Sequence, residues 1–480
     1  MSPREKADDT AAGDRPVASH DEVARAGAGA GASAGAVTGT STGADTTTDT
    51  GERRRRFRPE LSGGMVRPRS RMRRRLLLIF AIAGPGLIAA SAGNDAGGIA
   101  TYASAGSEFV YRTLFLMVLI AAGLAIVQEM SARLGAFTGK GLAALIREEF
   151  SIRLASLALV ALVISNLGIV VSEFAGIGAA FEIFGVSRYI SVPLAAIAIW
   201  VLVLFGTYRY AERVFLTLAL VFLVYPVAAI LAHPHWKTVA ADTLWPHFVM
   251  SKSFLLLAVA LIGTTISPYM QLYNASAVVD RGIGPEEYPL ERIDTVAGSL
   301  TASLISCSII IATGAAIGGS GVLTSASEAA KALEPVAGSA AEILFGLGLL
   351  GASALAGAIV PLSTSYALAE AVGVERSVSR RFSEAPLFLG LFTAQVLIGA
   401  IVALTPVNLV ALLIGTQVLQ GVLTPITLTF ILVLANRRSL LGDQANGRLL
   451  RVVAAVVVVL VGTMATALVA FTVLGWLGIR

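Results

Sequence analysis

Long apolar stretches separated by short polar segments make up most of this 480-residue chain. An apolar window of about 20 residues is long enough to cross the ~30 Å hydrocarbon core of a bilayer as a helix. The pattern therefore predicts an all-α polytopic membrane protein. Its eleven windows span about residues 75–105, 112–135, 152–183, 188–206, 212–233, 251–279, 294–319, 340–371, 387–405, 407–436 and 449–476.

Composition supports this class and excludes several others. Hydrophobic residues make up 55% of the chain, charged residues 14%, and the mean hydropathy is +0.77, values typical of a membrane protein. The single cysteine, Cys307, excludes a disulfide framework and a thiolate metal cluster. The sequence contains no phosphate loop, nucleophile elbow or zinc motif, so we expect neither an enzyme nor a permanently bound cofactor.

The first 74 residues form a separate region, which we expect to be a disordered cytoplasmic tail. The tail ends in two basic runs, RRRRFR at 53–58 and RMRRR at 71–75. Such runs directly before a spanning segment hold the N-terminus in the cytoplasm and contact anionic lipid, so nucleic acid is not an expected partner. Arginines are also enriched in the loops expected inside. Eleven spans then place the C-terminus outside, and we expect the protein in the cell membrane.

The first apolar window is interrupted by GNDAGG at 93–98. A charge near the bilayer centre costs at least ~2.5 to 3.5 kcal/mol, so Asp95 marks a candidate site. Gly93 and Gly97 are expected to let the helix unwind, which is tolerated at membrane depth where the backbone is buried in protein or lines a cavity. The alternative is a glycine packing cluster in which a neighbour satisfies Asp95. A broken helix with one acid favours a cation site.

The sixth window has a similar interruption, LIGTTISPYMQLYNASAVV at 261–279. Gly263 and Pro268 bracket its polar centre, and the proline removes a backbone donor and clashes with the preceding turn, so we expect a helix break there. Two interrupted helices, each first in a set of five, predict an inverted-repeat transporter with a site at the midplane. The transporter domain (75–480) is expected to comprise repeat one at about 75–233, repeat two at about 251–436 and an extra helix at about 449–476.

Several segments resemble the Nramp family of divalent metal transporters. The resemblance implies a leucine-transporter-type fold of two inverted five-helix repeats plus an eleventh helix. It also implies a divalent metal ion as substrate in a lipid bilayer, without fixing an oligomeric state. The segments are GPGLIAASAGNDAGG (84–98), QEMSARLGAFTGKGLAALIRE (128–148), GTTISPY (263–269), GSAAEILFGLGLLGA (338–352), TQVLQGVLTPITL (416–428) and NRRSLLGD (436–443).

The resemblance also implies a metal site, and this chain departs from the family there. Gly98 stands where the family has a ligand asparagine, and Ser267 stands where it has a methionine thioether. Replacing the soft sulfur with a hydroxyl leaves oxygen donors, which suit magnesium or manganese. The lost side chains are expected to widen the cavity for a hydrated magnesium ion. The alternative is an ordinary proton-coupled manganese or iron importer. The implied metal site comprises Asp95, Gly98, Thr264 through its carbonyl, Ser267 and Gln417.

Proton coupling is doubtful from the sequence. Tyr269 and Asn274 occupy positions where proton-coupled members of the family carry histidines, and neither titrates near neutral pH. Glu173 matches one acid of the family's proton route, while its partner acid is replaced by Gly176. The candidate proton route comprises Glu173, Arg380 and Arg381.

Two other function classes remain beside the metal transporter: a sodium-coupled organic-solute symporter on the same fold, and a nonselective channel or a scaffold. A sodium-coupled organic-solute symporter on the same fold would usually have a neutral unwound segment, so Asp95 argues against it. Two matched broken helices favour alternating access over an open pore. Glu129 and Arg133 lie one helical turn apart and are expected to pair structurally.

Overall fold

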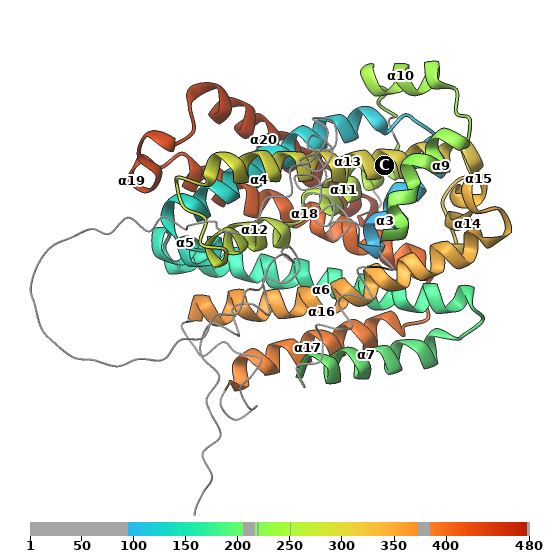
Figure 1. Cartoon of the computed structure of the whole chain (residues 1–480), viewed down its shortest axis with the longest axis horizontal. Coiled ribbons are helices and arrows are strands. Elements are labelled where there is room, and N and C mark those ends of the chain that lie inside the picture. The colour runs from blue at the N-terminus through green and yellow to red at the C-terminus, as the bar shows by residue number, and fades with distance from the viewer. Residues whose placement is uncertain (1–94, 205–216, 218–219, 250, 373–384, 478–480) are drawn as a thin grey trace, which may run out of the picture.

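The computed structural model describes residues 95–204, 217, 220–249, 251–372 and 385–477 (Figure 1). Within these ranges the regular elements are all helical. They are α3 (Ala96–Phe109), α4 (Leu114–Thr138), α5 (Leu142–Glu149), α6 (Ile152–Ile183), α7 (Arg188–Leu204), η1 (Leu220–Val224), α9 (Tyr225–Leu231), α10 (Trp236–Leu244), α11 (Lys252–Thr265), α12 (Pro268–Asp280), α13 (Tyr288–Ile317), α14 (Ala326–Ala330), η2 (Lys331–Leu333), α15 (Glu334–Ala337), η3 (Gly338–Ala340), α16 (Ala341–Val372), α17 (Pro386–Ala403), α18 (Leu409–Ala435), α19 (Arg438–Leu441), η4 (Gly442–Gln444) and α20 (Arg448–Trp476).

The helices reproduce the apolar windows of the sequence. Among the described residues, eight helical stretches are long and apolar enough to cross a membrane. Two shorter apolar stretches, Arg188–Leu204 and Leu220–Leu231, fall in the fourth and fifth windows, and α3 is the described part of the first. The expected all-α architecture is confirmed. The tail at 1–74, Gly93, Arg380 and Arg381 lie outside the described residues.

Helix α3 is packed among the helices that carry the polar centre of the molecule. It contacts α13, α18, α11, α6 and α16. Helices α6 and α16 run side by side, and α17 and α7 lie beyond them (Figure 1). Because α3 is covered on all sides, nearly all of its residues are buried, although several are polar. Polar groups in such a position need partners from neighbouring helices or from a ligand.

Helices α11 and α18 approach each other closely at two glycines. A β-carbon added at Gly263 would lie 2.1 Å from the Gln417 carbonyl oxygen, and one added at Gly421 would lie 2.1 Å from the Val259 carbonyl oxygen. Side chains at either position would therefore push the two backbones apart. This contact also corrects a prediction, because Gly263 lies in the last turn of α11 and not at the helix break. Position 263 is a glycine because α11 and α18 pack too closely there for a side chain.

Candidate functional site

Asp95 begins helix α3 and is almost fully buried, with 3% of its surface exposed. Its backbone is extended (φ −71°, ψ 169°), and its side-chain Oδ1 accepts a hydrogen bond of 2.6 Å from the Gly98 N–H. The acid is therefore the N-cap of α3, where the positive end of the helix dipole favours a negative charge. Gly97 belongs to the first turn of α3, so the prediction that it breaks the helix is wrong.

The predicted break in the sixth window is confirmed. Helix α11 ends at Thr265, and Pro268 is the first residue of α12, a position where a proline's missing N–H costs nothing. Ser267, between them, is extended, with φ −64° and ψ 135°. Its hydroxyl donates to the carbonyl oxygens of Gly263 at 2.9 Å and Thr264 at 3.0 Å. The carbonyl end of α11, which favours a cation, thus lies at the break.

The start of α3 and the end of α11 meet at Gly98. A β-carbon there would lie 2.5 Å from Thr264 Oγ1 and 2.9 Å from Asp95 Oδ1. Next to this contact, the hydroxyls of Tyr102 and Thr265 share a hydrogen bond of 2.9 Å. The expectation that Gly98 widens the cavity is wrong for this arrangement, because neighbouring side chains occupy the space.

Helix α18 contributes Gln417, which is fully buried. A β-carbon on Gly97 would lie only 1.8 Å from Gln417 Nε2, so the amide lies directly over the first turn of α3. The side chains of Gln417 and Thr264 are close enough to Asp95 to interact with it, yet neither Nε2 nor the Thr264 hydroxyl makes a hydrogen bond of normal geometry. The Gln417 Oε1 accepts a 2.7 Å bond from Gln420.

Helix α6 closes the other side of the site. The Ser172 hydroxyl lies 2.5 Å from the position of a β-carbon on Gly97. The next residue, Glu173, is fully buried, and neither of its carboxylate oxygens makes a hydrogen bond of normal geometry. One turn later, a β-carbon on Gly176 would lie 2.5 Å from Ala96 Cβ. The structure therefore brings Glu173 into the same polar centre as Asp95.

The assembled groups are suited to holding a cation through oxygen. No group of three or more His, Cys, Asp or Glu side chains that could hold a metal is found in the described part of the chain. An ion at this point would be held by one carboxylate and by neutral oxygens, the ligands that hard cations accept. The oxygen donors at this point are the Asp95 carboxylate and the Ser172, Thr264 and Ser267 hydroxyls, while Gln417 places its Nε2 over the first turn of α3 and its Oε1 toward Gln420.

Several residues of this centre were not singled out from the sequence. Ser172, Gln420 and Tyr102 are polar residues inside apolar windows, and that position is the signal that would have found them. Asn274, at one of the histidine positions, donates from Nδ2 to the Gln128 carbonyl at 2.9 Å. This bond joins α12 to α4 and assigns Asn274 a structural contact.

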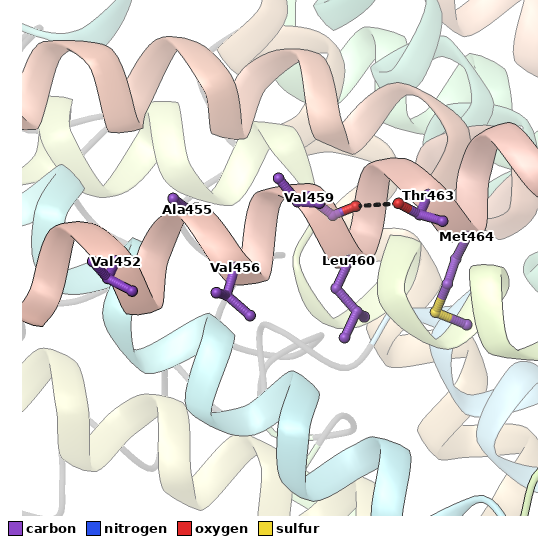
Figure 2. Close-up of a pocket in the computed structure, with 7 residues that line it drawn as sticks. All are labelled: Val452, Ala455, Val456, Val459, Leu460, Thr463 and Met464. Carbon is purple, nitrogen blue, oxygen red and sulfur yellow. Dashed lines mark hydrogen bonds between the residues drawn. The ribbon is translucent and has the colours of Figure 1, made fainter.

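A groove along α20 differs in character from this centre (Figure 2). Its lining includes Val456, Leu460 and Met464. The one hydroxyl in the lining, that of Thr463, already donates to the Val459 carbonyl at 2.8 Å, as Figure 2 shows. The groove offers a metal ion no charged group and only this one hydroxyl, so the polar centre at Asp95 is the better candidate for a metal site.

Comparison with known proteins points to one family. The model of the family described as "Natural resistance-associated macrophage protein-like" (Nramp) matches residues 86–471. A divalent metal cation transporter MntH from Ralstonia nicotianae is 30% identical over 399 residues, covering 78% of this chain and 87% of that protein. MntH 1 from Pseudomonas aeruginosa is 34% identical over 289 residues, covering 56% of this chain and 64% of that protein.

Comparison with solved structures shows which known proteins share the fold of this chain. The Eremococcus coleocola manganese transporter, crystallised with an aromatic bis-isothiourea substituted compound, has a TM-score of 0.63 at 19% identity, covering 86% of this chain and 90% of that chain. MhsT in complex with L-phenylalanine has a TM-score of 0.52 at 13% identity, covering 80% and 97%. The predicted leucine-transporter-type fold is confirmed.

Proposed function

This chain belongs to the Nramp family, and we propose that it transports a divalent metal cation by alternating access, with Asp95 as the one anionic ligand among the described residues. The observation that carries the proposal is the meeting of the start of α3 with the end of α11, just before the break that precedes α12, at one buried carboxylate. Asp95 at the start of α3 lies against Thr264 at the end of α11, and Gln417 of α18 lies beside Asp95, over the first turn of α3. Interrupted helices that meet in this way form the substrate sites of inverted-repeat transporters.

The oxygen donors support a hard cation, magnesium or manganese. A hydroxyl at Ser267 supplies no soft sulfur, so the donor set gives no preference to softer metals. The short distances around Gly98 also bear on which of these two metals fits the site. Magnesium keeps several waters and dehydrates reluctantly, whereas the buried arrangement around Asp95 leaves little space for them. Magnesium would thus enter and leave in a more open state than the one in the structure, and manganese fits the arrangement in the structure better.

Manganese is also favoured by the relatives, since one solved neighbour is a manganese transporter by name. An ordinary proton-coupled manganese or iron importer is therefore the second candidate. The two candidates differ in which metals are carried and in whether protons move with them. We place the protein in the cell membrane with a cytoplasmic N-terminus, on the basis of the basic runs before the first window.

Metal uptake by purified protein in liposomes tests the proposal directly. Magnesium, manganese, iron and calcium are offered singly, and wild type is compared with Asp95→Asn and with Glu286→Gln, an exposed acid in the loop between α12 and α13. We expect uptake of magnesium or manganese by wild type and Glu286→Gln. Uptake of none of these metals, or undiminished uptake by Asp95→Asn, would contradict the assignment.

A further inference from the structure

One face of α3 carries polar or small residues from its first turn to its last. Its members lie four, three and four positions apart, which places them on the same side of an α-helix: Gly97, Thr101, Ser104 and Glu108. A β-carbon on Gly97 would lie 1.8 Å from Gln417 Nε2, so this face begins inside the polar centre. It leads from there to the far end of α3, which the proposed cytoplasmic N-terminus places on the outer side.

The contacts that fix the outer end of α3 lie on other sides of the helix. A β-carbon on Gly106 would lie 2.5 Å from the Ile310 carbonyl oxygen of α13, and Gly106 is on the side opposite the polar face by its position in the helical repeat. The Ser107 hydroxyl donates to the Gly321 carbonyl at 2.7 Å, and the Ser107 carbonyl accepts at 2.7 Å from the Gly319 N–H. Packing against α13 and the segment after it therefore does not explain the polar face.

Two polar groups of this face make no hydrogen bond with the described residues. The Ser104 hydroxyl is fully buried, and Glu108 is half-buried with its Oε2 covered. Ser104 precedes Glu108 by one turn, so their side chains are neighbours on the helix surface. The Thr101 hydroxyl differs, because it donates to the Gly97 carbonyl at 2.7 Å. Buried polar groups are usually satisfied, so the pair of Ser104 and Glu108 is suited to a ligand.

The position of Glu108 is unfavourable for the helix itself. The acid lies in the last turn of α3, at the negative end of the helix dipole, and that turn contains no basic residue. The exposed Arg112 lies beyond the end of α3 and leaves Glu108 Oε2 without a hydrogen bond. A cation at this point would be attracted by the carboxylate and by the carbonyl end of the helix together.

We propose that Glu108 and Ser104 form an outer capture site, where a hydrated divalent cation binds before it reaches Asp95. This inference rests on the proposed transport of a divalent cation. Glu108 lies 13 positions after Asp95, about 20 Å along the helix axis, so the two carboxylates do not share an ion. Magnesium and manganese accept carboxylate, hydroxyl and water oxygens together. Because Ser104 is fully buried, the ion passes it only after this face of α3 opens.

The initial rate of manganese uptake in liposomes, measured against manganese concentration, tests the capture site. An acid that concentrates cations at the entrance should lower KM and leave later steps unchanged, so Glu108→Gln should raise KM by roughly fivefold with kcat within about twofold. Ser104→Ala should raise KM by roughly twofold. The effect of Glu108→Gln should shrink in high salt, which screens charges near solvent. Glu334→Gln, an exposed acid at the start of α15, is the control and should keep the wild-type KM.

Two results of the uptake measurement would overturn the inference. The first is a wild-type KM in Glu108→Gln, or an equal rise of KM in Glu334→Gln, which would show that Glu108 has no particular role at the entrance. The second is a lower kcat at unchanged KM together with a lower melting temperature, which would assign Glu108 to the packing of α3. Neither result would affect the assignment of Asp95.

Binding of manganese chloride to the purified full chain in detergent separates the capture site from the proposed function. The electron paramagnetic resonance signal of free Mn²⁺ measures binding without transport. Asp95→Asn should keep one weak manganese site, and Asp95→Asn combined with Glu108→Gln should lose it. Loss of all manganese binding in Asp95→Asn alone would overturn the inference. If Asp95→Asn instead transports metal undiminished while Glu108→Gln raises KM, the assignment of Asp95 is wrong and the capture site stands.

Discussion

Two buried acidic clusters in this chain differ in how their charges are satisfied. Around Glu129 on α4, both carboxylate oxygens have partners from Arg133, Arg292 and Tyr288. Around Asp95 on α3, the acid caps its own helix through Gly98, while the Thr264 hydroxyl and the Gln417 amide lie beside it without a hydrogen bond of normal geometry. The two acids are almost fully buried, Glu129 at 6% and Asp95 at 3% exposed, so burial alone does not distinguish them.

The difference indicates which cluster maintains the fold and which binds an ion. A network whose members satisfy one another fixes the positions of helices. The Glu129 carboxylate belongs to such a network, since its partner Arg133 also donates to the Gln444 carbonyl at 2.9 Å and to the Asn446 side chain, joining α4 to the segment before α20; only Arg133 Nε makes no hydrogen bond. A cluster with donors and acceptors left over keeps them for a ligand. Mutations around Asp95 should therefore reduce uptake with little effect on stability, and mutations around Glu129 should reduce stability with little effect on uptake per folded molecule.

The largest expected effect is at Asp95. Asp95→Asn should abolish divalent uptake, a loss of more than about 100-fold, because a neutral amide cannot balance a dehydrated dication. The melting temperature should change little, since an asparagine also caps a helix N-terminus well. Uptake in liposomes and thermal unfolding of the same preparation measure both quantities. Residual uptake above a tenth of wild type would show that another group carries the charge.

A mutation in the Glu129 cluster should reverse this pattern. Removing one partner of a buried ion pair costs about 3 to 5 kcal/mol, so Arg133→Met should lower the melting temperature and the yield of folded protein. Uptake per folded molecule should remain, because Arg133 does not belong to the site.

The double variant Glu129→Gln with Arg133→Met sharpens the test. It removes both charges together, so it should recover part of the stability lost in Arg133→Met. If Arg133→Met instead leaves stability unchanged and eliminates uptake, the two clusters do not divide into structural and functional roles.

The sequence predicted most of the fold because each window's hydrophobicity is a local property. The broken sixth helix was predicted at Pro268, where a missing donor and a steric clash act locally. Glu129 and Arg133 were paired correctly because residues four apart on a helix are neighbours, and the 3.4 Å ion pair confirms the pairing. In each case the deciding interaction lies within a few residues.

The features that sequence reasoning missed depend on contacts between distant segments. Gly263 was interpreted as a helix break, but its role is set by the carbonyl of Gln417 on another helix. Gly98 was expected to open a cavity, yet Thr264 lies against it, 166 positions further along the chain. Neither distance can be obtained from spacing along one helix, because both depend on how closely the helices pack.

The third prediction concerns selectivity at Ser267. Ser267→Met adds a soft thioether next to the carbonyl end of α11, so competition by cadmium should increase by about tenfold, equivalent to ~1.4 kcal/mol. Inhibition of manganese uptake by cadmium measures it. Ser267→Thr, which keeps the hydroxyl, is the matched control. An unchanged cadmium response would show that this position does not set selectivity.

Gly98→Asn tests selectivity at a position where the added side chain has no space. A β-carbon there would lie 2.5 Å from Thr264 Oγ1 and 2.9 Å from Asp95 Oδ1, so the variant must displace one of these groups to fold as the structure shows. We expect it to reduce uptake of every metal and not to shift preference. A clean change in selectivity with full uptake would mean that the site opens more widely during transport than the closed arrangement indicates.

The smallest expected effect is that of pH on uptake. The four histidines of the chain are His20, His233, His235 and His247, and none lies inside α3, α11 or α12. Without an imidazole at the site, uptake should change by less than about threefold between about pH 6 and pH 8. Liposomes loaded with a pH-sensitive dye should show no acidification while metal enters.

The dye measurement also bears on the difference between the two acidic clusters. If metal entry acidifies the liposomes and Glu173→Gln removes the acidification, then the unpartnered oxygens of Glu173 carry protons, and the second candidate function is correct. Glu129→Gln is the control for this outcome, because Glu129 is equally buried but fully partnered and should leave any proton movement unchanged. Loss of acidification in both variants would instead reflect general damage to the helices. Only a loss confined to Glu173→Gln identifies a proton route.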